Sequence, residues 1–261
     1  MLDVSAFVDG KEGIARRTAW LLRERIWAEG EGSGRALFTR RDESWRPYAP
    51  GLAAFGFPAS RITVIPNGTA EPAPARERDL VRAELGAQAD DVVLLMAATL
   101  RPEKRAALFV EAVAEARRRG APVRGVIAGG GPELERTRAR AAVVGGTILL
   151  GERSDVADLI SAADIVCLTS VAEGLPMIAL EAMALGRPVI STAVGGISEA
   201  VTPETGRLVG DGTAGFAEAI VELAGCADVR QAMGRAARER YLERYTVDRM
   251  ADAYLATLQD L

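Results

Sequence analysis

The chain has 261 residues, of which 49% are hydrophobic and 26% charged, and its formal net charge at neutral pH is -4. This composition is typical of a globular protein with one large or two small domains, and the negative balance excludes a general attraction to nucleic acid. Histidine is absent, which excludes a Ser-His-Asp triad, a histidine base and a histidine metal site within the chain. Any catalysis must use carboxylates, cations, hydroxyls and backbone dipoles, or a group from a second polypeptide. No metal site and no cofactor is expected.

Several sequence features bear on the cellular compartment. The two cysteines, Cys167 and Cys226, form no CxxC pair, which favours a reduced protein. No apolar run approaches the ~20 residues needed to cross a bilayer, and the N-terminus has no basic region followed by an apolar core. We therefore expect a cytoplasmic protein.

In the first 60 residues the periodicity of apolar residues is weaker than in the rest of the chain. Residues 12–28 predict a helix with apolar residues on one side, and residues 36–38 predict a short strand. The helix combines Trp20 and Trp27 with four arginines. Two interpretations stay open: a helix packed on protein, or a basic amphipathic helix in peripheral contact with a membrane.

From residue 62 onward, short apolar strands alternate with longer, periodic helices. The predicted strands are 62–65, 92–97, 123–128, 147–150, 164–168 and 188–191, and the predicted helices are 104–119, 133–143, 154–161, 176–185, 214–223, 229–241 and 247–258. Ser154 or Asp155 is expected to cap the third of these helices. The alternation predicts an α/β fold with a doubly wound, parallel, Rossmann-like sheet. Ligands of such sheets bind beyond the carboxyl ends of the strands, where the loops 98–104, 129–132, 170–176 and 193–198 are expected.

The most informative segment lies between two glutamates, Glu173 and Glu181. A buried strand leads into it, and Gly174, Leu175 and Pro176 open a helix that carries Glu181. The first amides of a helix are unpaired and form a natural seat for phosphate, and nearby carboxylates can accept hydrogen bonds from sugar hydroxyls. The segment predicts a site for a sugar joined to a diphosphate.

Six segments together carry a resemblance to a known family. The run EGLPMIALEAMALGRPVI, at residues 173–190, resembles the signature of retaining glycosyltransferases of family four, which adopt the GT-B fold. The other segments match in the same order: the interdomain turn at 62–68, the first donor-domain loop at 100–104, the glycine loop at 128–132, and the closing elements at 194–199 and 205–209. The resemblance runs from about residue 61 to residue 211. It implies a GT-B donor domain preceded by a truncated remnant of the N-terminal domain.

The resemblance also implies a role for each residue of the predicted site. Glu181 would hold the ribose hydroxyls of the nucleotide, Glu173 would touch the donor sugar, and Lys104 would neutralise the diphosphate. The amides near Gly174 and Leu175 would add hydrogen bonds to that diphosphate. The remaining residues expected around the donor are Arg101, Gly130, Gly131 and Gly195. Stabilising the charge of the departing nucleoside diphosphate is the main catalytic task, and a lysine with preorganised amides can do this without a metal.

Each of these residues also has a plainer interpretation. Glu173 fits a solvated loop carboxylate, and Glu181 fits an exposed helix residue. Lys104 fits a lysine in the first turn of a helix, although the helix dipole mildly disfavours a cation there. The glycines fit tight turns or helix entries.

Two departures from the family pattern affect what we expect. The family usually places an arginine where this chain has Thr99, and Arg101 could supply a cation from the same loop. The chain also has only about 60 residues before its donor domain, so the acceptor site and the family's acceptor-domain histidine would lie elsewhere. The chain is then a fragment, starts late, is completed by a partner, or no longer catalyses transfer.

The domain expectations follow from the same comparison. Residues 1–60 would be a remnant of the acceptor domain and linker, 61–245 a nucleotide-sugar-binding domain, and 246–261 a C-terminal helix packing back toward the N-terminal part. The expected function is transfer of a hexose from a nucleotide-diphosphate sugar to a hydroxyl of a saccharide or lipid-linked acceptor. The alternative is a catalytically incomplete binding module that needs a partner, and a nucleotide-sugar epimerase is disfavoured. Apolar surface at the place of the missing domain also makes self-association an expectation.

Overall fold

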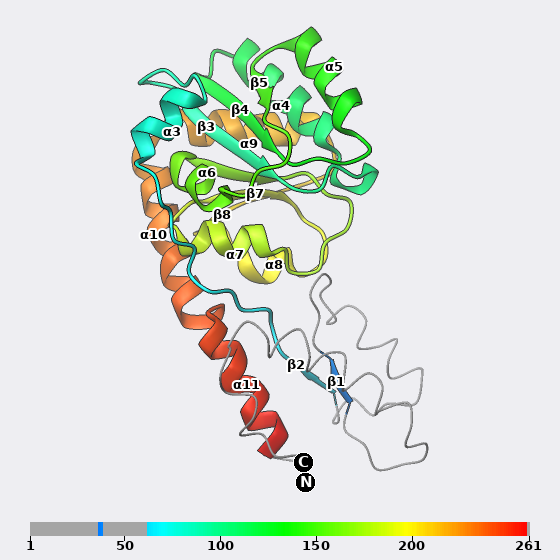
Figure 1. Cartoon of the computed structure of the whole chain (residues 1–261), viewed down its shortest axis with the longest axis vertical. Coiled ribbons are helices and arrows are strands. Elements are labelled where there is room, and N and C mark those ends of the chain that lie inside the picture. The colour runs from blue at the N-terminus through cyan, green and yellow to red at the C-terminus, as the bar shows by residue number, and fades with distance from the viewer. Residues whose placement is uncertain (1–35, 39–61, 260–261) are drawn as a thin grey trace.

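A six-stranded, fully parallel sheet forms the centre of the molecule (Figure 1). In this computed structural model residues 36–38 and 62–259 are described, and the helix expected at 12–28, with Trp20 and Trp27, lies outside them. The strands are β3 (Val92–Ala97), β4 (Val123–Ala128), β5 (Thr147–Leu149), β6 (Ile165–Leu168), β7 (Val189–Thr192) and β8 (Gly206–Val209). Their spatial order is β5-β4-β3-β6-β7-β8. The chain therefore builds outward from β3 in one direction, then starts again at β6 in the other, which creates a switch point between β3 and β6.

Strand β3 is apolar at every position because both faces of the sheet are covered. In β3, Val92, Leu94 and Met96 belong to one core cluster, whereas Val93 and Leu95 belong to the other. Successive side chains of a strand point to opposite faces, so a strand between two helical layers needs apolar residues at every position.

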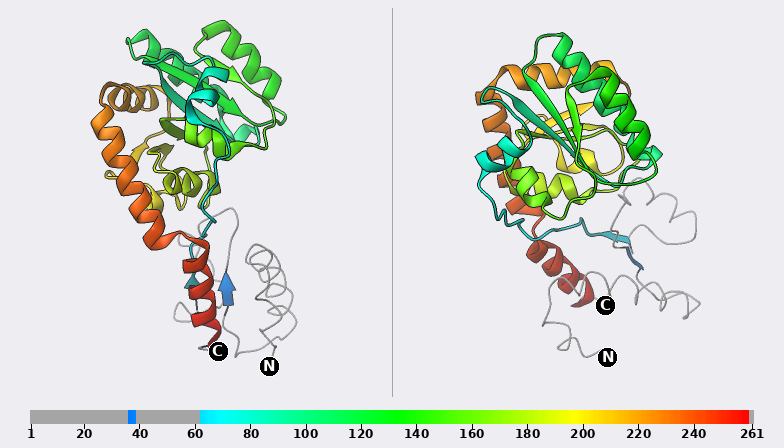
Figure 2. Two further views of the ribbon diagram at one scale, coloured as in Figure 1. Left: turned by 60° about the vertical axis from the view of Figure 1, so that its left-hand side comes forward. Right: turned by 45° about the horizontal axis from the view of Figure 1, so that its top comes forward.

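Two helical layers cover the sheet (Figures 1 and 2). One face packs against α4 (Ala106–Arg118), α5 (Leu134–Val144) and α9 (Thr213–Gly225). The other packs against α3 (Arg78–Glu84), α6 (Val156–Ala162), α7 (Met177–Ala184) and α8 (Ile197–Ala200). The expected doubly wound α/β fold is confirmed.

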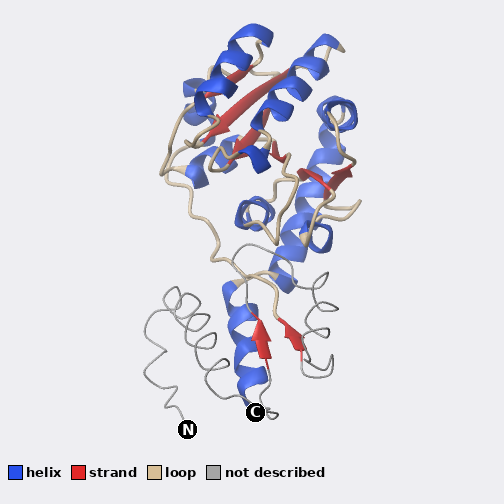
Figure 3. Ribbon diagram, turned by 90° about the vertical axis from the view of Figure 1, so that its right-hand side faces the viewer, coloured by secondary structure: helices blue, strands red, loops and turns tan. Residues whose placement is uncertain are grey.

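The C-terminal helices extend away from the sheet. α10 (Ala227–Arg244) packs on α7 through a third cluster that includes Leu180, Met183 and Tyr241. α11 (Val247–Gln259) lies beside a small parallel pair of strands, β1 (Ala36–Phe38) and β2 (Ile62–Val64) (Figures 1 and 3). The amide of Gly68 donates to the Met250 sulfur at 3.2 Å, which ties the segment after β2 to α11.

Most predicted elements are found within one or two residues of their expected ends, but some differ or were not predicted. The helix expected from Lys104 begins at Ala106, because a 3-10 turn (Pro102–Lys104) and a left-handed residue, Arg105, precede it. The side chain of Asp155 makes no capping bond to α6 and instead accepts hydrogen bonds from Arg153. Helices α3 and α8 and strand β8 were not predicted.

No helix among the described residues is long and apolar enough to cross a membrane.

Candidate functional site

The predicted site residues lie at the switch point of the sheet. The loop after β3 carries Arg101 and Lys104, and the loop after β6 carries Glu173 and Gly174. Because β3 and β6 are neighbours and parallel, both loops leave the sheet at the same edge. A crevice outside the carboxyl ends of the strands at this point is the usual ligand position in open α/β sheets.

A partly buried ion pair joins the two loops. The ammonium of Lys104 lies 2.6 Å from Oε1 of Glu173, and the hydroxyl of Ser170 donates to the same oxygen at 2.5 Å. The side chain of Glu173 is 8% exposed and that of Lys104 is 25% exposed. The interpretation of Glu173 as a solvated loop carboxylate is therefore wrong, since the protein holds it in a fixed position between a cation and a hydroxyl.

Lys104 is the only lysine among the described residues; every other basic side chain there is an arginine. A lysine ammonium is a compact charge with three rotatable donors, unlike the flat fork of an arginine. It can therefore hold Glu173 and still present N–H donors to a second acceptor at this edge of the sheet.

Arg105, which the sequence analysis did not single out, joins three loops of the site. It is the only described non-glycine residue with a positive φ, at 49°. Its Nε donates to the carbonyl of Thr169 at 2.7 Å, and its guanidinium also pairs with the carboxylate of Asp211. A left-handed conformation costs a non-glycine residue about 1–2 kcal/mol. These contacts offset the strain and hold the guanidinium between the loops that carry Thr169 and Asp211.

Two substitutions separate the strain at Arg105 from its contacts. Arg105→Ala and Arg105→Gly both lose the guanidinium, and we expect each to lower the free energy of unfolding by about 1–2 kcal/mol. Because only glycine tolerates the left-handed backbone freely, Arg105→Gly should be the more stable of the two, by up to about 1 kcal/mol. Urea unfolding of the three proteins measures both differences. A more stable alanine variant would show that the left-handed backbone does not persist without the guanidinium.

Gly195 lies where two loops approach too closely for any side chain. Its φ is +56°, and a Cβ on it would lie 1.6 Å from the carbonyl oxygen of Glu173. The next amide, Gly196, donates to the carbonyl of Gly174 at 2.8 Å. The loop after β7 therefore holds the backbone of the loop after β6 in place, which is a structural reason for the glycine besides the predicted contact with a donor.

The glycine loop after β4 supports the loop after β3 in the same way. A Cβ on Gly131 would lie 2.8 Å from the carbonyl oxygen of Leu100, and the Leu100 amide donates to the Gly130 carbonyl at 2.7 Å. The side chain of Glu152 covers Gly130, with its Oε1 2.8 Å from the position of a Cβ there. Contact of Gly130 and Gly131 with a donor stays a prediction.

Two backbone amides, those of Gly174 and Leu175, lie directly before α7. Gly174 and Leu175 are both buried, and their N–H groups donate to no atom of the described residues. The carbonyls of the same residues are occupied, by the Gly196 amide and by the side chain of Asn67 at 3.2 Å. Buried amides are almost always paired in folded proteins, so two adjacent unpaired ones indicate a place for an acceptor.

Glu181 lies in the second turn of α7 with a half-buried carboxylate. Burial raises the pKa of this carboxyl above its usual value of 4.5, and no described residue forms a hydrogen bond or ion pair with it. Glu181 forms no hydrogen bond or ion pair with Lys104 or Glu173. The interpretation of Glu181 as an exposed helix residue is wrong, and a partly desolvated carboxylate without a partner suits an acceptor for ligand hydroxyls.

Replacing Glu181 with glutamine is expected to stabilise the fold. An acid whose pKa is raised on folding binds its proton more tightly when folded, so its contribution to stability is lost as the pH rises through that raised value. Glu181→Gln should therefore be more stable than the parent at pH 7, and the gain should vanish below pH 4.5. Urea midpoints at both pH values measure this, with the exposed Glu218→Gln as control. A glutamine variant that is less stable at pH 7 would refute the desolvated environment.

The remaining loop residues are open to solvent. Arg101 is exposed, and its side chain contacts no described partner. Thr99, which occupies the place of the family's usual arginine, is exposed too, and its carbonyl accepts from the Arg101 amide at 2.8 Å. Arg101 is therefore free to reach an anion at this edge, and its predicted role stays a prediction.

Comparison with known sequences decides the family. The profile of the family described as glycosyl transferases group 1 matches residues 91–225. The chain belongs to the group 1 glycosyl transferases. The matched region of this group 1 glycosyl transferase contains every residue of the predicted site, and the family predicted from the sequence motifs is confirmed.

Two curated proteins are similar in sequence to this group 1 glycosyl transferase. A D-inositol 3-phosphate glycosyltransferase of Kribbella flavida is 33% identical over 205 residues, which cover 72% of this chain and 48% of the relative. An N-acetyl-alpha-D-glucosaminyl L-malate synthase of Bacillus anthracis is 35% identical over 117 residues, covering 44% of this chain and 30% of the relative. The chain spans about half the length, or less, of these relatives.

Solved structures share the fold of this group 1 glycosyl transferase. The Anabaena HepE structure in complex with UDP-glucose is similar with a TM-score of 0.74 at 21% identity, covering 94% of this chain and 68% of HepE. WaaG, a glycosyltransferase involved in lipopolysaccharide biosynthesis, has a TM-score of 0.70 at 19% identity, covering 94% of this chain and 70% of WaaG. At these identities the similarity shows the fold alone, and it confirms the GT-B type expected from the motifs.

Proposed function

We propose that this chain binds a nucleotide-diphosphate sugar and forms the donor-binding half of a retaining hexosyltransferase. The observation that carries the proposal is the pair of amides at Gly174 and Leu175, which have no acceptor among the described residues and lie on the loop whose Glu173 pairs with Lys104. Amide donors at a helix start together with an adjacent ammonium form a site for a diphosphate. HepE, which shares the fold, has been solved with UDP-glucose, and this supports the same ligand class here.

In the proposed arrangement each group has a separate task. The Gly174 and Leu175 amides and the Lys104 ammonium hold the diphosphate and stabilise the charge that grows on it as the glycosidic bond breaks. The Glu173 carboxylate, fixed by Lys104 and Ser170, accepts a hydrogen bond from the donor sugar. Glu181 accepts hydrogen bonds from the ribose hydroxyls. The acceptor hydroxyl attacks from the face that the diphosphate leaves, which retains the configuration of the sugar.

The proposal also includes the division into domains and the class of acceptor. Residues 61–245 would form the donor domain, residues 1–60 a remnant of the acceptor domain and linker, and the helix at 246–261 would return toward the N-terminal part. The bond from the Asn67 side chain to the Leu175 carbonyl supports a direct connection between the interdomain turn and the donor loop. The acceptor would be a saccharide or a lipid-linked sugar, and the protein would act in the cytoplasm.

A second candidate is a binding module that completes its active site with a partner. The chain spans 48% of the relative from Kribbella flavida, so much of a complete enzyme's length has no counterpart in it. Both candidate functions use the same donor site. They differ in whether this chain takes part in the transfer of the sugar without a partner.

A titration followed by a transfer assay tests the proposal. Calorimetry should show saturable binding of UDP or GDP with one molecule per chain, and absence of binding to either nucleotide would refute the donor site. The purified chain should transfer little or no sugar from UDP-glucose to a set of saccharide acceptors. Efficient transfer by this chain alone would contradict the need for a separate acceptor half.

A further inference from the structure

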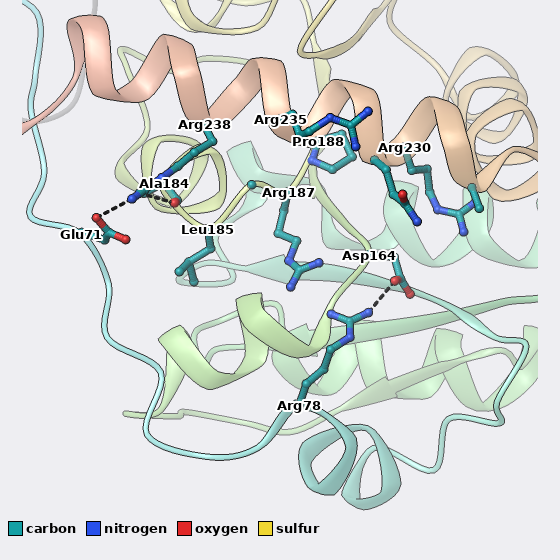
Figure 4. Close-up of a pocket in the computed structure, with 14 residues that line it drawn as sticks. Glu71, Arg78, Asp164, Ala184, Leu185, Arg187, Pro188, Arg230, Arg235 and Arg238 are labelled. Carbon is teal, nitrogen blue, oxygen red and sulfur yellow. Dashed lines mark hydrogen bonds and ion pairs between the residues drawn. The ribbon is translucent and has the colours of Figure 1, made fainter.

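A large cavity lies at the opposite edge of the sheet from the donor loops. Its volume is about 690 Å³, and Asp164 and Pro188, which precede β6 and β7, contribute to its wall. Helix α10 closes one side of it (Figure 4). Because the loops of the predicted donor site follow the same strands at their other ends, the cavity and that site are separated by the length of the strands.

The cavity is strongly basic in a protein whose overall charge is negative. Two carboxylates line it, those of Glu71 and Asp164. Its arginines are Arg78, Arg187, Arg230, Arg235 and Arg238. Arginines therefore outnumber carboxylates in the lining of the cavity. The formal charge of the whole chain has the opposite sign, at -4.

Both carboxylates are already paired. Glu71 lies 2.7 Å from the guanidinium of Arg238. Asp164 lies 2.6 Å from Arg78 and 2.9 Å from Arg82. Among the described residues this leaves three lining arginines without a carboxylate partner.

These three arginines differ in their surroundings. Arg230 donates to the carbonyls of Leu223 and Ala224, at 2.5 and 2.9 Å, which caps the end of α9 without neutralising the charge. Arg235 is exposed, and its side chain has no partner among the described residues. It is therefore free to meet an anion at the mouth of the cavity.

Arg187 is the central unsatisfied group. Its Nε is buried without a hydrogen-bond partner among the described residues, and its Nη2 donates to the carbonyl of Ser161 at 2.8 Å. Burial is the main cause that lowers the pKa of Arg187 to about 10; the nearby charges of Arg78 and Arg82 act in the same direction, and Asp164 opposes them. Figure 4 shows Arg187 and Arg78 reaching toward each other from opposite walls. A buried cation that faces another cation is costly unless an anion compensates it.

We propose that this cavity is a second ligand site, distinct from the predicted donor site, which binds a soluble phosphate ester. The guanidinium fork matches a phosphate geometrically, and several forks around one cavity can bind a group of two or more negative charges. The volume lies within the ~300–1,000 Å³ that small-molecule pockets occupy. The proposal does not depend on the donor site being functional.

Binding of inorganic pyrophosphate tests the site directly. Calorimetry on the whole chain should show saturable binding that weakens about tenfold in Arg187→Gln and at least threefold in Arg235→Ala. Arg138→Ala, at an exposed arginine of α5 remote from the lining residues, is the matched control and should bind as the parent does. Because Arg235 has no partner among the described residues, its variant should fold normally even if Arg187→Gln does not.

A donor-site variant separates the two sites. In Lys104→Met the pyrophosphate site should persist, with its sensitivity to Arg235→Ala unchanged. Loss of all pyrophosphate binding in Lys104→Met would place the anion in the predicted donor site and overturn the proposal. Absence of binding to the parent chain, or equal binding by the parent and both cavity variants, would overturn it as well.

Discussion

Replacing Gly195 with alanine is expected to lower the free energy of unfolding by about 2 kcal/mol or more and to weaken UDP binding more than tenfold. The glycine has a φ of +56°, and a Cβ there would lie 1.6 Å from the Glu173 carbonyl oxygen, a distance that no packing tolerates. One of the two loops must therefore move. Since Gly196 also bonds to Gly174, the movement would displace the amides proposed to hold the diphosphate. Urea unfolding and UDP calorimetry measure the two losses.

Two glycines provide the controls for that substitution. Gly120 has a φ of +88° with nothing within 4 Å of a Cβ, so Gly120→Ala measures backbone strain without crowding. Gly210 has open space and no positive φ, so Gly210→Ala should change little. If Gly195→Ala behaves like Gly120→Ala and keeps its UDP affinity, the contact with Glu173 has no part in shaping the site.

Replacing Lys104 with methionine should weaken UDP binding at least tenfold, a loss of about 1.4 kcal/mol or more. The substitution removes the cation that both pairs with Glu173 and faces the proposed diphosphate, and it leaves an uncompensated, largely buried carboxylate beside that position. UMP, which lacks the second phosphate, should lose less affinity than UDP. Calorimetry with both nucleotides gives the difference.

Charge and shape can be separated at the same position. Lys104→Arg keeps the positive charge and should retain most of the UDP affinity, although a flat guanidinium cannot hold Glu173 in the same geometry. Equal losses for UDP and UMP in Lys104→Met would show that the lysine only supports the fold of the loop. No loss for either nucleotide would remove Lys104 from the site.

The sequence predicted the sheet well because strand patterns here are local. Runs such as 92–97 are apolar at every position, and both faces of the resulting strands are indeed covered. Helix α3 was missed because its seven residues show no apolar periodicity, and Val81 is the one buried residue among them. It is tied down by long-range contacts that no local pattern reveals, such as those of Arg78 and Arg82 with Asp164.

The site was predicted in part. Motif order brought Lys104 and Glu173 to the same edge of the sheet, and the structure places them in contact. The motifs gave no sign of Arg105, whose left-handed backbone depends on carbonyls that lie 64 residues away in sequence. Nor could they show that the glycines at 130, 131 and 195 accommodate neighbouring backbone or side chains, because such crowding arises only when separate loops meet. The basic cavity was missed for the same reason, since its arginines come from α3, α10 and the turn before β7.

The most direct test of the central claim is a UDP titration of three proteins: the parent chain, Glu181→Ala and Glu218→Ala. Glu181 carries a half-buried carboxylate without a described partner, whereas Glu218 is an exposed glutamate on α9. If the carboxyl edge of the sheet binds the nucleotide of an activated sugar, Glu181→Ala should bind UDP at least tenfold more weakly than the parent, and Glu218→Ala should bind it equally well. Equal affinity of all three proteins for UDP would contradict the account.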